Sequence, residues 1–384
     1  MSNLFIFICA GILLGILAGL IPGLHSNTLI SILSSFQIPD FYLLIILLVP
    51  ANMIVAYIPS LFFSIPEDGS VVSVLPGHRM TLDGKGLLAL KTIILSILLA
   101  TLISIVIFPL SLGFFPMIYG AISPFIKYIV LLLSAIFVLK SKNRVMSAFV
   151  FLLAGTIGYA SFNSPMEDPF LPMFTGFFAI PALLMYSHQK IKEQKDLPLS
   201  GFDIRFVLIG VVGGVLSDLL PGISSTGQVA TFLTIFMPMN TLGYLSAISS
   251  IATSQMVLAL STASSLGKAR VGGIVWLDQF VDITANLDYL LVLMLFSTVV
   301  TCALVYLFRK KIGKLAEFNM TKMNRVLVIY LTAIVFIIDG WFGLGIFALG
   351  SLLGYLTIKV GVPRTNLMGA VIVPTLLLLF RVFI

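Results

Sequence analysis

Two stretches of the chain repeat one another, and this repeat limits what the chain can fold into. Residues 15–28 read GILAGLIPGLHSNT and residues 214–227 read GVLSDLLPGISSTG, at a constant offset of 199 residues. Because proline removes a backbone donor and glycine relaxes the backbone, each apolar helix is expected to end at Pro-Gly. A new helix should then begin in the small polar residues that follow. Paired broken helices half a chain apart are typical of membrane carriers that hold a substrate centrally.

The composition places the chain in a membrane. Hydrophobic residues make up 59% of the 384 residues, charged residues only 10%, and the mean hydropathy is +1.14. A span takes roughly 20 apolar residues, and runs of that kind recur along the whole chain. We therefore expect an all-α polytopic membrane protein with about ten to twelve membrane segments. The apolar runs at 28–36 and 228–238 directly follow the two breaks and are too short to cross, which is typical of broken or re-entrant helices.

Charged residues divide the chain into a first membrane repeat (1–187), a polar linker (188–203) and a second membrane repeat (204–384). Basic loops at 140–144 and 190–195 flank a hairpin whose tip carries Glu167 and Asp168. Both loops then lie on one face, and the excess of Lys and Arg predicts that this face, with the linker, is cytoplasmic in a multi-pass plasma-membrane protein. The net charge of +7 is spread over loops, so nucleic acid is not an expected partner. The number of spans per half leaves the orientation of the halves open, although inverted repeats are common in such carriers.

The residues after each break form the first candidate binding site. A helix start carries unpaired N–H groups and a partial positive charge, so an anion can bind there. The first copy offers Pro22, Gly23, His25, Ser26, Asn27 and Thr28, and the second offers Pro221, Gly222, Ser224, Ser225, Thr226 and Gly227. In the alternative interpretation, Pro-Gly only kinks a membrane helix and the hydroxyl residues cap the next one. His25 could bind the anion, relay a proton or act as a simple cap.

A second polar cluster interrupts the apolar runs at residues 60–86 and contains Ser64 and Ser70; its counterpart at 253–273 contains Ser261 and Thr262. We interpret the two as a second pair of re-entrant tips that would add to the substrate site, because irregular backbone at membrane depth needs protein or a watery cavity around it. Ordinary turns outside the membrane are the alternative.

One carboxylate lies within an apolar helix. Asp218 takes the place of Gly19 in the second copy, where a charge costs about 3 kcal/mol in the bilayer. It could bind a coupling Na⁺ or H⁺, or could lie near the interface and pair with a Lys or Arg. Glu67 and Asp68 are further coupling candidates, and Asp339 is interpreted as a hairpin tip.

The sequence contains no motif of an enzyme or of an ATP-driven pump. HExxH, CxxC, GxSxG and GxxxxGK[ST] do not occur, and Cys9 and Cys302 both lie in apolar runs. No enzyme activity, metal or cofactor is expected beyond a possible coupling ion.

Four segments together resemble a known family. They are the two Pro-Gly repeats, LPGHRMTLDGKGLLALK at 75–91, the stretch 153–184 that ends in GFFAIPALL, and DGWFGLGIFALGSLLGYLTIKVGVPRTNLMGAVIVP at 339–374. In these segments the chain resembles the large membrane subunit of the tripartite tricarboxylate transporters, and more closely the compact stand-alone archaeal and bacterial proteins related to it. The resemblance implies secondary uptake of an organic anion, a carboxylate, with an extracytoplasmic binding protein and a small membrane subunit as partners. The family's Pro-Gly motifs fall on Pro22, Gly23, Pro221 and Gly222.

The favoured hypothesis is an ion-coupled carrier that holds a small organic anion between the two broken-helix tips. A second hypothesis keeps the fold but takes a polyprenyl phosphate as cargo, since a donor-rich helix start suits either anion. A third, from another class, is an intramembrane enzyme that acts on a lipid, with His25 and Asp218 as acid and base. A lateral apolar opening at the motif would favour the lipid carrier, and a closed polar cavity would favour the carrier of a soluble anion.

Overall fold

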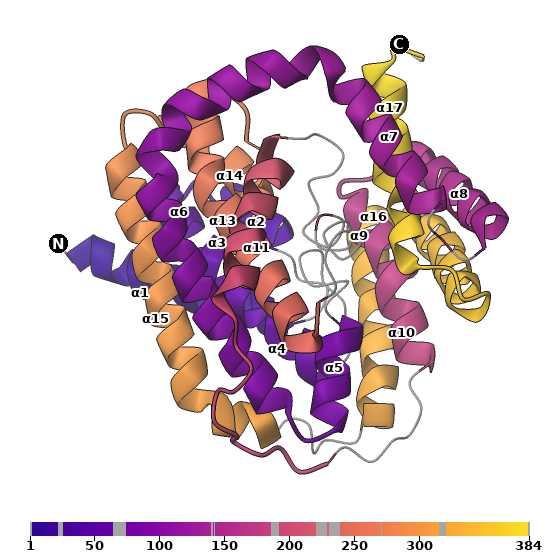
Figure 1. Ribbon diagram of the computed structural model, residues 1–384, viewed down its shortest axis with the longest axis horizontal. Helices are drawn as coiled ribbons and strands as arrows, with labels where there is room; N and C mark the ends of the chain where they lie inside the picture. The colour runs from indigo at the N-terminus through magenta and orange to yellow at the C-terminus, as the bar shows by residue number, and fades with distance from the viewer. Residues whose placement is uncertain are drawn as a thin grey trace.

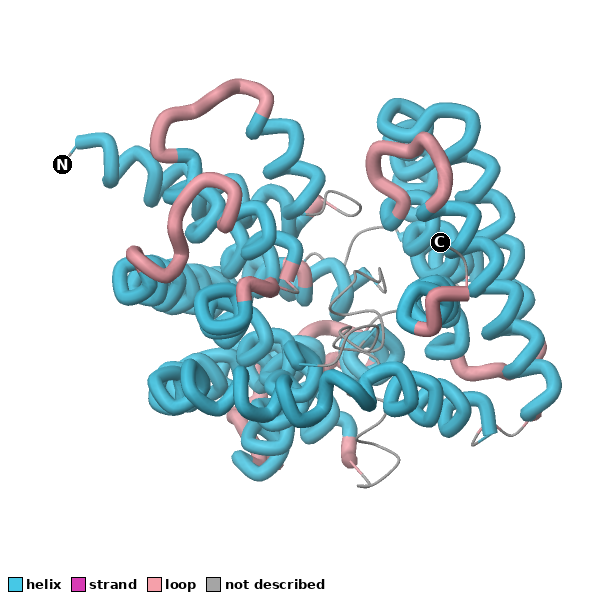
Figure 2. The backbone as a smooth tube through the Cα atoms, turned by 90° about the horizontal axis from the view of Figure 1, so that it is seen from above, coloured by secondary structure: helices cyan, strands magenta, loops and turns pink. Residues whose placement is uncertain are grey.

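The structure, a computed structural model, describes residues 2–21, 26–63, 74–139, 141, 143–185, 192–219, 229, 239–269, 271–314 and 320–382. Within these ranges every regular element is a helix and no strand is present, which confirms an all-α polytopic architecture. Figure 1 shows that the helices form two bundles that lie side by side, and the same division is visible from above in Figure 2.

The first bundle contains helices from both halves of the sequence. From the first half it takes α1 (Ser2–Leu20), α2 (Ser26–Ser34), α3 (Phe41–Val55), α4 (Tyr57–Phe63), α5 (Val74–Leu82) and most of α6 (Gly86–Ile122). From the second half it takes α11 (Ile204–Leu219), α13 (Thr241–Leu266), α14 (Gly272–Leu277) and α15 (Leu287–Gly313).

The second bundle is also built from both halves. It contains α7 (Ile126–Leu139), α8 (Arg144–Phe162), α9 (Phe170–Phe174), the π-helical turn η2 (Thr175–Ala179), α10 (Ile180–Met185), α16 (Met320–Lys359), the 3-10 turn η4 (Arg364–Met368) and α17 (Gly369–Leu379). The end of α6 crosses between the bundles at the top of Figure 1 and passes through the short turn η1 (Ser123–Phe125) into α7. The spatial units therefore do not coincide with the two halves of the sequence.

Six helical stretches among the described residues are long and apolar enough to cross a membrane: Phe41–Phe63, Gly86–Ile136, Arg144–Phe162, Thr241–Leu266, Leu287–Gly313 and Asn324–Lys359. Shorter apolar helices cover Leu4–Leu20, Phe170–Ala179 and Arg364–Leu379. Large apolar side chains on the outer helices are strongly exposed, including Val106 (76%), Ile337 (78%) and Trp341 (80%). In water such a surface would be unfavourable, whereas lipid accommodates it, so the protein is a multi-pass membrane protein. The total of ten to twelve segments stays a prediction, because much of 220–238 lies outside the described residues.

Helices α3 and α13 form the buried centre of the first bundle. Every residue of α13 from Gly243 to Ala263 is buried, and α3 is buried along almost its whole length. The start of α3 and the end of α13 share one apolar cluster, which includes Leu47 and Leu258. The end of α3 and the start of α13 share another, which includes Val55 and Leu245. The two central helices therefore run in opposite directions.

Glycines let α1 approach α3 closely. A Cβ atom on Gly11 would lie 2.8 Å from Leu47 Cβ, and one on Gly15 would lie 2.4 Å from the carbonyl oxygen of Leu48. Real Cβ atoms essentially never come closer than 3.0 Å to another heavy atom. Small residues at this spacing are how membrane helices gain close backbone packing.

Helix α11 packs against α13 in the same way. A Cβ atom on Gly210 would lie 2.5 Å from Ser250 Cβ, and one on Gly214 would lie 2.8 Å from the carbonyl oxygen of Ile251. Each glycine is 199 residues after its counterpart in α1, and each facing residue is 203 residues after its counterpart in α3. The two contacts therefore use corresponding positions of the chain.

Helix α16 folds back on itself. Gly340 has φ 60° and ψ −152°, a left-handed conformation that favours glycine and ends the first arm after Asp339. Before the turn, Asn324 Nδ2 donates to the carbonyl oxygen of Leu183. After it, a Cβ atom on Gly354 would lie 2.3 Å from the carbonyl oxygen of Phe177. Both arms thus lie along the same segment, α9 to α10, and the prediction that the chain turns at Asp339 is correct.

Candidate functional site

The first turn of α2 is the part of the predicted anion site that the structure describes. As expected from the first Pro-Gly break, a short helix of 9 residues begins at Ser26. Ser26 is 5% exposed and Thr28 7% exposed, so both hydroxyls lie inside the protein. Asn27 packs on the start of α14, where a Cβ atom on Gly272 would lie 2.3 Å from Asn27 Nδ2. The first backbone N–H groups of a helix have no partner within it, which is the condition on which the predicted anion site rests.

A carboxylate of the second bundle contacts this turn. Thr28 Oγ1 donates to Asp168 Oδ2 at 3.1 Å, which links α2 to the loop between α8 and α9. The other oxygen, Asp168 Oδ1, accepts from the backbone N–H groups of Phe170 (3.1 Å) and Leu171 (3.2 Å) at the start of α9. Three donors therefore surround the Asp168 carboxylate.

Asp339 completes this group at the turn of α16. Its Oδ1 accepts from the backbone N–H of Asp168 at 2.9 Å. The side chain is 8% exposed, and Oδ2 is buried without a hydrogen-bond partner among the residues the structure describes. A buried polar atom of this kind costs about 1–3 kcal/mol, and more if it is charged. Thr28, Asp168 and Asp339 thus meet where the two bundles face each other.

The coupling candidate Asp218 lies within the first bundle. It is 2% exposed, and its Oδ2 accepts from Thr262 Oγ1 at 2.7 Å, so α11 and α13 are joined by a buried hydrogen bond. The structure therefore brings together two residues that the sequence marked separately. Beside Thr262, Ser261 Oγ lies 2.7 Å from Ser111 Oγ of α6.

The structure corrects the interpretation of 253–273 as an irregular tip. Ser261 and Thr262 lie inside the continuous helix α13, which ends only at Leu266, with Gly267 in a left-handed conformation (φ 59°) as its cap. Several hydroxyls of this stretch donate to carbonyls of the preceding turn, as Thr253 does to Ser249 at 2.8 Å. A helix can hold many Ser and Thr residues in this way without breaking.

The other candidate residues lie outside the described residues. They are Pro22, Gly23, His25, Ser64, Glu67, Asp68, Ser70, Pro221, Gly222, Ser224, Ser225, Thr226 and Gly227. Convergence of the two Pro-Gly segments on one substrate therefore stays a prediction.

Sequence reasoning did not assign Asp168 and Asp339 to a site, because it interpreted both as hairpin tips. Both are at tips, but the two tips contact each other: Asp339 is buried, and the partly buried Asp168 also reaches Thr28. The available signal was the pair Asp339-Gly340 between two apolar runs, since a carboxylate next to a glycine there marks a turn at the end of an apolar helix.

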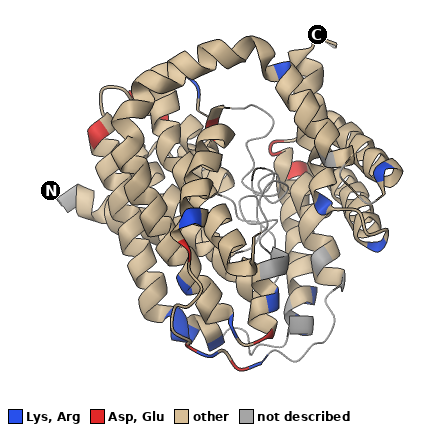
Figure 3. Ribbon diagram, viewed as in Figure 1, with Lys and Arg blue, Asp and Glu red and all other residues tan. Residues whose placement is uncertain are grey.

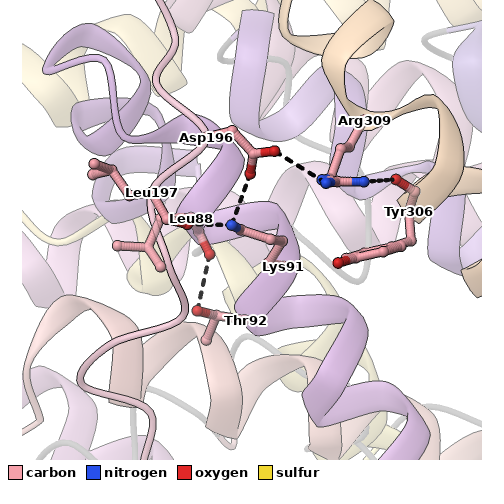
Figure 4. A network of polar contacts seen from close by, with 7 residues as sticks. All are labelled: Leu88, Lys91, Thr92, Asp196, Leu197, Tyr306 and Arg309. Carbon is pink, nitrogen blue, oxygen red and sulfur yellow. Dashed lines mark hydrogen bonds and ion pairs between the residues drawn. The ribbon is translucent and has the colours of Figure 1, made fainter.

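Charged residues gather mainly at one edge of the molecule, the lower edge in Figure 3. Here the linker lies along α5 and α6, and Lys195 N donates to the carbonyl oxygen of Gly84 at 2.9 Å. Figure 4 shows the strongest contacts: Asp196 accepts from Lys91 Nζ (2.8 Å) and from Arg309 Nη2 (3.0 Å). The hydrogen bond from Lys91, aided by Arg309 against a smaller opposing effect of burial, holds the pKa of Asp196 below its ordinary value. This cluster fixes the linker to both halves of the first bundle and has no feature of a substrate site.

The long apolar helices, the buried carboxylates Asp218 and Asp339, and the contact of Thr28 with Asp168 define a multi-pass membrane protein with polar groups held between two bundles. The model of the tripartite tricarboxylate transporter TctA family matches residues 5–201. The chain belongs to this family, and it is therefore a tricarboxylate-type transporter component of a tripartite system. It is also 27% identical, over 99% of its own length and 100% of the relative's, to an uncharacterized protein of Methanocaldococcus jannaschii. No solved structure matches the chain.

Proposed function

We propose that the chain is the permease of an ion-coupled secondary transporter for a small organic anion, a carboxylate. One observation carries the proposal: the buried Thr28 in the first turn of α2 donates a hydrogen bond to a carboxylate, that of Asp168, which belongs to the other bundle. This turn is therefore chemically suited to a carboxylate group. Family membership favours a carboxylate over a polyprenyl phosphate as cargo.

In this proposal the substrate binds at the breaks. The first-turn N–H groups of α2 and the Ser26 hydroxyl hold one carboxylate group of the substrate. The corresponding turn after Pro221-Gly222 supplies the second half of the site, with Ser225 in the position of Ser26. The linker and the charged edge of the first bundle face the cytoplasm. An extracytoplasmic binding protein and a small membrane subunit would deliver the substrate, as the family's tripartite organisation suggests.

We also infer that residues 1–187 and 204–384 are two inverted halves. The matching glycine contacts of α1 with α3 and of α11 with α13 support this, together with the opposite directions of α3 and α13. In the second bundle the glycine contacts are exchanged between the halves: Gly155 of the first half faces Val373 of the second, and Gly354, 199 residues after Gly155, faces Phe177 of the first. Halves of this kind permit alternating access by movement of one bundle against the other.

The test is a proteoliposome uptake screen with labelled mono-, di- and tricarboxylates under inward Na⁺ and H⁺ gradients. Uptake of at least one carboxylate above protein-free liposomes is expected, with collapse of the gradient abolishing accumulation. If no carboxylate is transported under either gradient and none raises the thermal midpoint of the purified protein, the proposed substrate class is wrong.

A second arm tests the α2 turn. Thr28→Val keeps the β-branched shape but removes the donated hydrogen bond, and it is expected to reduce uptake. Ser35→Ala, an exposed hydroxyl just beyond α2 that bonds only to Ile32 in its own turn, is the matched control and should leave uptake unchanged. Equal uptake by the two variants would remove the α2 turn from the site.

A further inference from the structure

The group formed by Thr28, Asp168 and Asp339 is distinct from the coupling candidates that the sequence suggested. It joins three elements that are far apart in the chain: the start of α2, the loop before α9 and the turn of α16. Asp218, in contrast, lies inside the first bundle and bonds to Thr262. A ligand in the Thr28 group would contact both bundles at once.

The chemistry of this group favours a cation. The side chains that meet here end in carboxylate and hydroxyl oxygens. Backbone N–H groups and the Thr28 hydroxyl donate to both Asp168 oxygens and to Asp339 Oδ1, whereas the Oδ2 atom of Asp339 is buried without a donor among the described residues. Lys91, Lys192, Arg205 and Arg309 form ion pairs with carboxylates other than Asp168 and Asp339. Within the part of the chain that the structure describes, no basic side chain balances these two carboxylates, so a small cation is the ligand that completes the group.

The turn of α16 adds further oxygen ligands. Because Gly340 ends the first arm, the last carbonyl groups before it lose their partners in the helical ladder. The end of a helix also carries a partial negative charge. Carboxylates, a hydroxyl and freed carbonyls are hard oxygen ligands, and ends of broken helices coordinate Na⁺ in membrane carriers.

Glycine at position 343 makes room for this arrangement. A Cβ atom there would lie 2.3 Å from Asp339 Cβ, so any larger residue must displace the carboxylate. Replacement of Gly343 by alanine would therefore move Asp339 without a change in the charge of the protein.

We propose that Asp168 and Asp339, with the Thr28 hydroxyl, bind a Na⁺ ion between the two bundles, and that this is the ion whose gradient drives transport. The second statement rests on the proposed function, whereas the first does not. The ion offsets one of the two negative charges of Asp168 and Asp339 on one bundle, and Asp168 also accepts a hydrogen bond from Thr28 of the other bundle. Its binding and release would then strengthen and weaken the contact between the bundles.

The experiment measures Na⁺ binding without any substrate. The thermal midpoint of the purified full-length protein is recorded against NaCl concentration, with choline chloride keeping the ionic strength constant. Na⁺ should raise the midpoint of the wild type saturably, by about 2 °C or more. Asp339→Asn should abolish the rise, and Gly343→Ala should weaken apparent Na⁺ affinity at least tenfold. Asp288→Asn, an exposed carboxylate at the start of α15, is the control and should keep the full response.

The outcomes separate this inference from the proposed function. An unchanged Na⁺ response in both Asp339→Asn and Gly343→Ala would overturn the site, as would a wild-type midpoint that depends on pH but not on Na⁺. If Asp339→Asn does not fold, Gly343→Ala and Asp168→Asn carry the same test through ²²Na⁺ binding. A wild type that binds Na⁺ but transports no carboxylate would leave the ion site in place and overturn the transport function. Carboxylate uptake with the same Na⁺ dependence in wild type and variants would support the transport function and overturn the ion site.

Discussion

The close contact of α1 with α3 predicts a large difference in stability between two Gly→Ala substitutions, Gly15→Ala and Gly113→Ala, although both glycines lie inside apolar helices. A Cβ atom on Gly15 would lie 2.4 Å from the carbonyl oxygen of Leu48 and 2.6 Å from Ala51 Cβ, whereas ordinary contacts begin near 3.4 Å. The two helices must therefore separate by about 1 Å along their contact, because the backbone carbonyl cannot rotate away. Overpacking of this kind costs about 1–3 kcal/mol.

The control is Gly113→Ala in α6, where nothing lies within 4 Å of the new Cβ atom. Alanine is favoured over glycine in a helix by roughly 0.8–1 kcal/mol, so this variant should be as stable as the wild type or more stable. Thermal unfolding of the detergent-solubilised protein, followed by the fluorescence of a thiol-reactive dye, ranks the three proteins. Gly15→Ala should unfold several degrees below Gly113→Ala. Equal midpoints would refute the close packing of α1 on α3.

Three further predictions follow from named contacts. Asp196→Asn should lower the free energy of unfolding by about 1–2 kcal/mol near pH 7. Because the pKa of Asp196 is lower in the folded protein than its ordinary value of 3.8, this stabilisation is fully present above the ordinary pKa and is lost as pH falls through the folded pKa. Denaturant titrations of wild type and variant should therefore converge in strong acid. Thr262→Val and Asp218→Asn should be non-additive in a double-mutant cycle by roughly 0.5–3 kcal/mol, and additive effects would contradict their hydrogen bond. Ser225→Ala should weaken carboxylate binding without a change in thermal midpoint, and unchanged binding would remove that hydroxyl from the site.

Some features of this fold could be predicted from short stretches of the sequence. A Pro-Gly pair followed by small polar residues favours a new helix start, so the short helix after the first break could be predicted as 28–36 and is found at Ser26–Ser34. Proline alone does not end a helix here, since Pro50 lies inside α3 and Pro109 and Pro116 lie inside α6. The turn at Asp339-Gly340 could be placed because a carboxylate next to a glycine lies there between two apolar runs. The density of apolar residues alone indicated a membrane protein, because no soluble fold buries so many.

Other features depend on contacts that sequence patterns do not contain. Helix α13 carries enough Ser and Thr to be interpreted as an irregular tip, yet these hydroxyls bond within the helix and α13 is the most buried helix of the first bundle. Buried helices and lipid-facing helices are both apolar all round, so periodicity does not separate them. The approach of Asp168 to Thr28 depends on how the two bundles face each other, and 140 residues separate the pair.

The central claim is that the first turn of α2 binds a carboxylate group, and equilibrium binding tests it most directly. Labelled citrate, succinate and acetate are titrated against purified wild type and Ser26→Ala in the presence of Na⁺, with Ser35→Ala as the control. The account predicts saturable binding of at least one carboxylate to wild type and control, with affinity about 10-fold or more weaker in Ser26→Ala, the effect of one hydrogen bond to a charged group. Equal affinity in all three proteins, or no binding of any carboxylate to the wild type, would contradict it.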